Sequence, residues 1–395
     1  MGWTVSVDKP TWENWRRCEH ADLGPRLREL VKISPAGPAD DNFAQIALSD
    51  AACPFLSGGL CEIHAKIGES SLSTACATYP RVVNRVDDVL HRSLALSCPE
   101  AARLVLLNPA PMEFDEEPGP QNPRRPLRVA TLRTSDEASA KPYRYFREIR
   151  ALAVWLLQHR AAPLWKRLVI LASFCDRLHE IAAPFSQVPQ LLDEYRDIAG
   201  RNLFGDVLAN LQPRPALQLE LILEMIVQRI GSDFTSPRFL ECYREFMQGI
   251  EWTAQSTMEE IAARYARAFA EDYRPFMSRH EYMLEHWLAG YVHRTLFPLG
   301  AQEPARDPGD HPPPESIRDQ CLILLVHYAV IQTLLIGLAG FHKSSFDAGH
   351  VIRGVQSSAK AFEHSLSFPP SALKILAAKG VNNCAALALL TRMEA

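Results

Sequence analysis

After residue 142 the chain carries apolar residues at spacings of three and four positions almost to its end. This spacing puts them on one face of an α-helix, and each such face must be buried against another helix. Strand-like alternation is nearly absent there. The sequence therefore predicts an all-α domain over residues 143–395, with no repeat of constant period. The expected helices lie within 144–157, 163–181, 215–230, 237–250, 258–273, 280–297, 321–341 and 349–366.

The segment 321–341 is long and apolar enough to span a bilayer. His327, Tyr328, Gln332 and Thr333 interrupt it, and it lacks flanking aromatic and basic anchors. We therefore expect a buried core helix here and no membrane partner.

A proline-rich stretch, residues 108–142, divides the chain. Its seven prolines forbid regular helix and its charges keep it in water. We interpret it as a linker or a long surface excursion, with a separate cysteine-rich region before it over residues 1–107.

The region 1–107 has mixed local patterns. Alternation around Val5 and at 43–48 predicts short strands, and the segment that starts at Pro10 predicts a helix. Gly58 and Gly59 supply the turn of a small hairpin, and a helix is expected after Cys98 with proline in its first turn. The fold class expected for the whole chain is mainly α: a small cysteine-rich α+β N-terminal region followed by an all-α helical domain.

The charge balance argues against a polyanionic partner. The chain has 42 basic and 46 acidic residues, a net charge of −4. This provides no overall attraction for nucleic acid or an anionic membrane. The first residues show no signal peptide, so we expect a cytoplasmic protein with reduced cysteines.

Four of the nine cysteines fall within 46 residues, separated by seven, fourteen and twenty-one residues: Cys53, Cys61, Cys76 and Cys98. The spacing matches no zinc knuckle. Four thiols on short connecting elements can nevertheless converge on zinc or on an iron-sulfur cluster. The alternative is that they are buried small hydrophobic residues. For Cys18, Cys175, Cys242, Cys321 and Cys384 we favour packing in the core.

The segment 53–104 combines CPFL, a glycine turn, LCEIH, YPR and LSCPEAARL. It resembles the flagellin lysine-N-methylase family of bacteria and shares the cysteine pattern of broader zinc- or iron-chelating proteins. Residues 2–12, 281–298 and 351–368 resemble further segments of that family. The similarity touches both halves of the chain but not the proline-rich stretch.

The resemblance implies methyl transfer from S-adenosylmethionine to lysine side chains of flagellin, which would be the protein substrate. It also implies a metal centre on Cys53, Cys61, Cys76 and Cys98. We expect a 4Fe-4S iron-sulfur cluster, with zinc as the alternative. Family members carry further cysteines immediately before the Gly2-Trp3 pair, so we expect the natural protein to begin upstream of Met1. If it begins at Met1, the cluster is incomplete and the protein inactive.

Lysine methylation needs a neutral amine, so a general base or a pKa-lowering site is required. The candidate catalytic residues are Glu285 and Tyr291 on one predicted helix, and Glu363 and His364 on another. Each has a structural alternative, because polar groups within helical bundles usually make satisfied structural bonds. No glycine-rich GxGxxG turn follows a strand, so the binding site of the methyl donor is not predicted.

A second function class stays open. In it, the cysteine region binds a metal only to stabilise a helical protein-interaction surface without catalytic activity. Zinc alone would favour this alternative, whereas an iron-sulfur cluster and methyl transfer would favour the enzyme.

Overall fold

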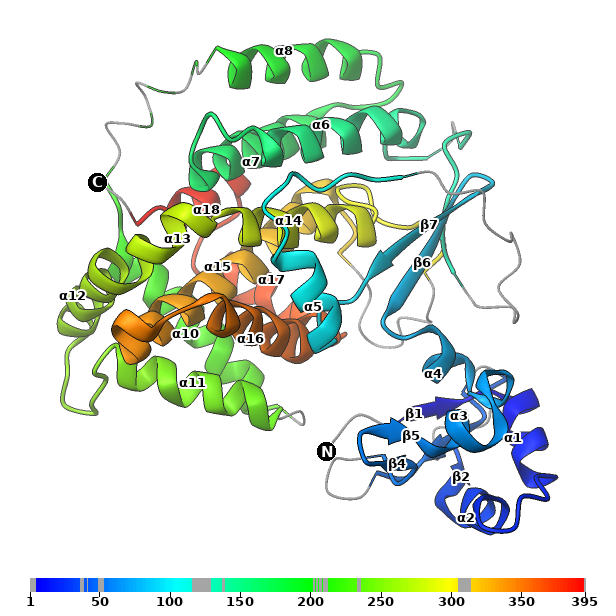
Figure 1. The fold of residues 1–395 in the computed structure, drawn as a ribbon. Helices are drawn as coiled ribbons and strands as arrows, with labels where there is room; N and C mark the ends of the chain where they lie inside the picture. The colour runs from blue at the N-terminus through cyan, green and yellow to red at the C-terminus, as the bar shows by residue number, and fades with distance from the viewer. Residues whose placement is uncertain are drawn as a thin grey trace. The chain divides into compact units, whose positions relative to one another are not determined.

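A computed structural model describes residues 5–35, 39–40, 42–48, 53–115, 129–136, 139–201, 203, 205, 208, 212–232, 236–304 and 314–393. They form two compact units. Unit 1 comprises the described residues up to Val82, and unit 2 comprises those from Val83 onward (Figure 1). The division thus falls earlier in the chain than the proline-rich stretch.

Unit 1 is built on a three-stranded antiparallel sheet of order β1-β3-β2, in which β3 (Ala44–Ile46) pairs with both β1 (Val5–Val7) and β2 (Val31–Ile33). Helices α1 (Lys9–Arg16) and α2 (Leu23–Leu30) pack beside it. The strands and helices bury one small core. Its residues are Val7, Trp15, Leu23, Leu27, Val31, Ala44, Ile46, Phe55 and Ile63.

A two-stranded hairpin, β4 (Leu56–Ser57) and β5 (Leu60–Cys61), completes unit 1 together with α3 (Glu62–Ile67) and α4 (Thr74–Thr78). Gly58 and Gly59 have φ angles of 57° and 80°. Two consecutive left-handed residues are what a tight hairpin turn requires, and glycine adopts them without steric cost. The predicted hairpin is confirmed.

Unit 2 contains a second three-stranded sheet of order β7-β6-β8. Strands β6 (Arg81–Val86) and β7 (Val89–Leu94) are adjacent in sequence. Strand β8 (Ala130–Leu132) pairs with β6 in parallel, with Val86 opposite Leu132. Part of the predicted linker is therefore a strand of this sheet, which local sequence patterns did not indicate.

The rest of unit 2 is helical in its described residues, so the mainly α fold with a small α+β N-terminal region is confirmed. Two π-helical segments, η3 (Phe269–Tyr273) and η5 (Ala359–Glu363), interrupt the α-helical pattern. The α-helices are α5 (Pro99–Leu106), α6 (Phe146–Gln158), α7 (Leu164–Glu180), α8 (Val188–Gly200), α10 (Pro215–Ile230), α11 (Pro237–Gly249), α12 (Met258–Ala268), α13 (Arg274–His280), α14 (Tyr282–Arg294), α15 (Ile317–His342), α16 (Ala348–Ser358), α17 (Phe368–Ala378) and α18 (Cys384–Leu390).

Helix α15 is the core of unit 2 and packs against α7, α11 and α16 (Figure 1). Its most apolar stretch is entirely buried by the protein, in agreement with the prediction of a core helix. The crossing with α11 is unusually close. A Cβ atom placed on Gly249 would lie 1.8 Å from the carbonyl oxygen of Gly337, so only glycine lets the two backbones approach this far.

Candidate functional site

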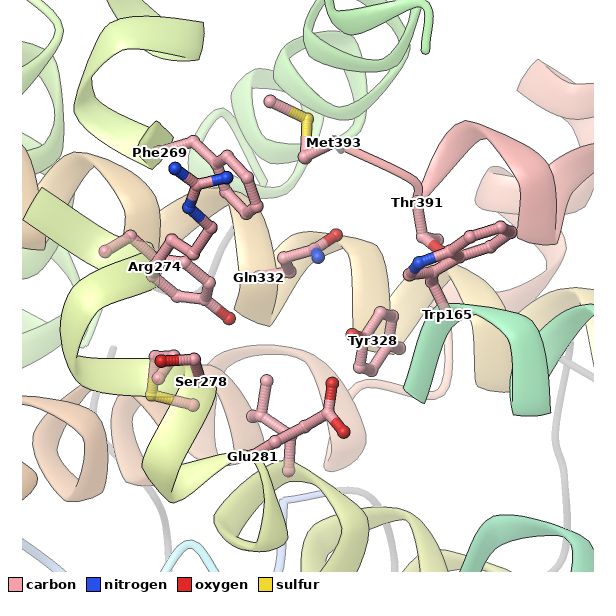
Figure 2. A pocket seen from close by; sticks show the side chains of 12 residues that line it. Trp165, Phe269, Arg274, Ser278, Glu281, Tyr328, Gln332, Thr391 and Met393 are labelled. Atoms are coloured by element: carbon pink, nitrogen blue, oxygen red, sulfur yellow. The ribbon is translucent and has the colours of Figure 1, made fainter. Parts of the chain in front are cut away.

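A pocket in unit 2 opens where the chain from η3 to the start of α14 passes α15, the first turn of α7 and the residues after α18 (Figure 2). It holds about 490 Å³ of space free of protein atoms, including its open mouth. Most of this space belongs to the open mouth, so the pocket can enclose one end of a small organic molecule and not the whole of it. The buried floor includes Trp165, Phe269, Tyr273, Tyr328 and Gln332, and the rim includes Arg274, Ser278 and Glu281.

Two aromatic residues of the floor lie in a π-helical segment. Phe269 and Tyr273 both belong to the π-helical segment η3, and their rings stack with centroids 5.5 Å apart. Such insertions widen one turn of a helix and are frequent at functional sites. Burial raises the pKa of Tyr273 and Tyr328 well above the usual value, so both hydroxyls stay protonated and can donate.

Trp165 presents a polar atom without a partner. Its side chain is 9% exposed, and its Nε1–H makes no hydrogen bond to the described residues. The guanidinium of Arg392 lies over the indole, 4.6 Å from the ring centroid, and holds the ring in place. Figure 2 shows the indole nitrogen turned toward the middle of the pocket. A buried, unsatisfied donor is costly, and a ligand that accepts its hydrogen bond would remove that cost.

Arg274 and Glu281 lie at opposite ends of α13 on the rim (Figure 2). They are seven positions apart in the sequence, which corresponds to a rise of roughly 10 Å along a helix. Arg274 is exposed and pairs with no carboxylate in the part of the chain that the structure describes. Glu281 is paired: it accepts hydrogen bonds from the backbone N–H of Leu164 at 3.0 Å and from Arg167 at 2.5 Å.

Arg167 connects the pocket rim to Glu285, the first of the predicted catalytic residues. Glu285 is fully buried, and its carboxylate accepts hydrogen bonds from Arg167 at 2.7 Å and from Arg160 at 2.8 Å. Burial alone would raise the pKa of Glu285, but the two guanidinium groups lower it below the usual value. Glu285 is therefore ionised, and it joins α14 to Arg167 on α7 and to Arg160 in the loop between α6 and α7.

Tyr291 and Glu363 come together in a second buried cluster with Trp287, Arg294 and His327. The Trp287 indole donates to Glu363 at 3.0 Å, and Arg294 pairs with the other carboxylate oxygen. The Tyr291 ring lies 5.5 Å from Trp287 and 5.7 Å from His327, between centroids. Burial lowers the pKa of His327 to about 4, so its imidazole is neutral. Two of the predicted catalytic residues are thus neighbours, although they are 72 positions apart.

His364, the fourth predicted catalytic residue, lies next to this cluster in sequence. Its Nε2 is 2.8 Å from the hydroxyl of Ser97, just before α5. Glu285 makes its contacts elsewhere, with Arg160 in the loop after α6 and with Arg167 on α7. The structure thus separates the four candidates into two groups, and none of them lines the described pocket.

Three of the predicted metal ligands, Cys53, Cys61 and Cys76, belong to unit 1. Burial is the main cause that raises the pKa of Cys53, and the neighbouring Cys61 raises it further. The pKa of Cys76 is also raised, by the protein atoms around its sulfur and by both other thiols, although the residue retains exposed surface. The three thiols therefore lie within electrostatic reach of one another.

Thiols are suitable metal ligands, but the described side chains do not form a metal-binding arrangement. No group of three or more His, Cys, Asp or Glu side chains in the described residues is arranged to hold a metal ion. Cys98 is half-buried and lies in unit 2. Packing is confirmed for Cys175, Cys242, Cys321 and Cys384, which are buried, whereas Cys18 is half-buried against the core of unit 1.

The pocket was not predicted from the sequence. Trp165, Tyr273, Tyr328 and Glu281 are more than 160 positions apart at the extremes, and each occupies an ordinary place in an amphipathic pattern. The one local signal is the run of polar and aromatic residues after position 268, where the helical spacing shifts by one residue.

Residues 150–390 match the sequence profile of the FliB lysine N-methylase C-terminal domain. The flagellar biosynthetic protein FliU of Salmonella muenchen is 25% identical over 119 residues, which are 29% of this chain and 69% of that protein. A lysine-N-methylase of Salmonella typhimurium (strain LT2) and another of Salmonella choleraesuis (strain SC-B67) are each 24% identical over 119 residues. These matches span 29% of this chain and 29% of each methylase. No solved structure matches the chain significantly.

Proposed function

Since the chain belongs to the FliB lysine N-methylase family, we propose that it transfers methyl groups from S-adenosylmethionine to lysine side chains of flagellin. The observation that carries this proposal is the profile match over residues 150–390, which includes the helices around the described pocket. The names of the three Salmonella relatives, flagellar protein and lysine-N-methylase, support the substrate and the reaction.

In the proposed reaction the neutral ε-nitrogen of lysine attacks the methyl carbon of the donor. A C–N bond forms, the C–S bond breaks, and S-adenosylhomocysteine leaves as a neutral thioether. The proton lost from the new ammonium passes to a base or to water. A lysine amine is protonated in water at neutral pH, so the site must remove its proton or lower its pKa.

Glu285, Tyr291, Glu363 and His364 are the proposed catalytic residues, and the contacts divide their roles. We assign acceptance of the proton to His364, whose Nε2 lies 2.8 Å from the Ser97 hydroxyl. Burial lowers the pKa of His327, beside Tyr291, to about 4, so its imidazole is a poor base near neutral pH. Glu285 and Glu363 are bound by arginines, which suits them to positioning the helices.

We further propose that Cys53, Cys61, Cys76 and Cys98 bind a 4Fe-4S cluster, or zinc as the alternative. The mutual influence of the first three thiols supports this, because a metal requires thiolates that are close together. A bound centre would cross-link the short elements that carry these cysteines and so stabilise their fold.

A cytoplasmic location fits this proposal, since all nine cysteines are free thiols in the structure. Flagellin is the proposed partner. Nucleic acid and membrane have no part in the proposal, in keeping with the net charge of −4 and with the complete burial of the most apolar stretch of α15.

Methyl transfer from labelled S-adenosylmethionine to purified flagellin tests the function. The protein is prepared both anaerobically and in air, and flagellin whose lysines have been acetylated serves as the control substrate. We expect label on unmodified flagellin alone, and mass spectrometry of its peptides should locate methyl groups on lysine. Absence of transfer in both preparations contradicts the proposal. Metal binding without transfer would instead support the non-catalytic interaction module.

A further inference from the structure

We propose that the pocket bordered by Trp165, Tyr328 and Arg274 binds the carboxylate of a small amino-acid ligand, and that this ligand is the methionine end of the methyl donor. This inference rests on the proposed function for the identity of the ligand. The chemistry of the pocket rests on the described contacts alone, so the two can be tested separately.

Two donors of the pocket, the indole N–H of Trp165 and the guanidinium of Arg274, have no carboxylate partner among the described residues. Trp165 Nε1–H is nine-tenths buried, has no acceptor among the described residues, and points into the pocket (Figure 2). An indole can only donate a hydrogen bond. The missing partner is therefore an acceptor that a ligand brings with it.

The positive charge of Arg274 indicates that the acceptor on the ligand is negatively charged. Its guanidinium stands on the rim without a carboxylate partner in the residues that the structure describes. A guanidinium binds a carboxylate through two parallel hydrogen bonds, which are stronger than bonds between neutral groups. A carboxylate supplies acceptors that a guanidinium or an indole N–H can bind, whereas a purely cationic ligand supplies none.

The walls fit the rest of an amino acid such as methionine. Phe269, Tyr273 and Tyr328 offer apolar ring faces to a methylene chain, and ring faces also attract a sulfonium. Glu281 lies at the other end of α13, where it can face the positive part of the ligand (Figure 2). Its charge is already shared with Arg167, so we assign it a smaller contribution than Arg274.

A lysine of the protein substrate is the competing occupant. It would present a cation to the rings and to Glu281, but it carries no carboxylate for Arg274 and Trp165. The unpartnered donors therefore favour the methyl donor over the substrate side chain in this pocket.

Calorimetry on the full chain tests the inference with two probes. S-adenosylhomocysteine has the amino-acid end, whereas 5′-methylthioadenosine keeps the adenosine and the thioether but lacks that end. We expect the first probe to bind at least about tenfold more tightly, the size of one charge-assisted contact. Equal affinities, or no binding of either probe, would overturn the inference.

Arg274→Gln should lower the affinity for S-adenosylhomocysteine by about tenfold and leave that for 5′-methylthioadenosine unchanged. Arg279→Gln is the matched control, because Arg279 is an exposed arginine of the same helix that does not line the pocket. Trp165→Phe keeps a ring and removes the N–H, and its melting temperature is recorded to separate binding from folding. Unchanged affinity in Arg274→Gln would sink the inference even if Trp165→Phe unfolds.

The two proposals fail in different ways. Arg274-dependent binding of S-adenosylhomocysteine without methyl transfer to flagellin would leave the pocket assignment standing and remove the substrate. Methyl transfer with a KM for S-adenosylmethionine unchanged by Arg274→Gln would keep the enzyme and remove the pocket assignment.

Discussion

Trp287 donates its indole N–H to Glu363 over 3.0 Å inside unit 2, and this bond ties α14 to the π-helical segment η5. The other oxygen of the same carboxylate pairs with Arg294, also on α14. Burial alone would raise the pKa of Glu363, but Arg294 and His327 lower it below the usual value. Glu363 is therefore ionised, and Trp287 and Arg294 each bind one of its carboxylate oxygens.

Glu363→Gln should destabilise the protein by about 3–5 kcal/mol, because it leaves the charge of Arg294 nearly buried and without its partner. Urea unfolding measures this. In the double variant Glu363→Gln with Arg294→Met neither charge remains, so we expect it to recover part of the loss. A single variant as stable as the parent but inactive would show that Glu363 acts in catalysis and not in the structure.

Glu285→Gln should be destabilising for a related reason, again by about 3–5 kcal/mol, because two arginines share this fully buried carboxylate. Glu194→Gln is the matched control. It removes one exposed carboxylate from its pair with Arg177, and such pairs contribute less than about 1 kcal/mol. Chemical denaturation of both variants at pH 7 is the measurement, and equal losses would contradict the assigned role of Glu285.

Cys76→Ser should lower the metal content of anaerobically purified protein, since it removes one of the proposed ligands, a thiol whose pKa Cys53 and Cys61 both raise. Cys242→Ser is the control, because Cys242 is buried in unit 2, where its sulfur accepts a hydrogen bond from Ser357 at 3.6 Å. We expect the control to retain the metal even if its melting temperature falls. Elemental analysis and absorbance spectra decide between iron and zinc, and a parent protein without metal would refute the proposed centre.

Much of this fold was predicted, because helices and hairpin turns depend on residues that are close together in the sequence. The hairpin at Gly58 and the helices around Trp165 and Glu285 depend on turn chemistry and on apolar spacing. Strand β8 was missed because its only support is pairing with β6, more than forty residues earlier.

The candidate sites were harder to predict for the same reason, since their partners are far apart in the sequence. A glutamate in an apolar helix, such as Glu285, attracts attention as a catalytic candidate, but its partners Arg160 and Arg167 are more than a hundred positions away. No spacing rule connects them. The pocket depends in addition on a π-helical turn, which shifts Tyr273 relative to the preceding helix.

The stability of unit 2 should decline as the pH falls from about 6.5 to about 4, owing to His91, His293 and His327, of which His327 is the most deeply buried. Burial lowers the pKa of this histidine to about 4, against a usual value of 6.5. Within this interval the unfolded chain binds a proton that the folded chain does not, so lowering the pH favours unfolding. The shift corresponds to a loss on the order of 3 kcal/mol when complete.

The groups that face His327 act in opposite directions. Glu363 favours its charged form and Arg294 disfavours it, while the rings of Tyr291 and Phe368 exclude water. His327→Phe keeps a ring in that space and removes the proton site, so it should reduce the slope of stability against pH between 6.5 and 4. His91 and His293 keep their lowered pKa in this variant and maintain the rest of the slope. His179→Gln, an exposed change on α7, should leave the slope unchanged. Urea titrations at half-unit pH steps give the slopes. Protonation of Glu285 and Glu363 removes stability only below pH 4.5, in the parent and the variant alike. If the slope above pH 4.5 is the same in His327→Phe as in the parent, the assignment to His327 is refuted.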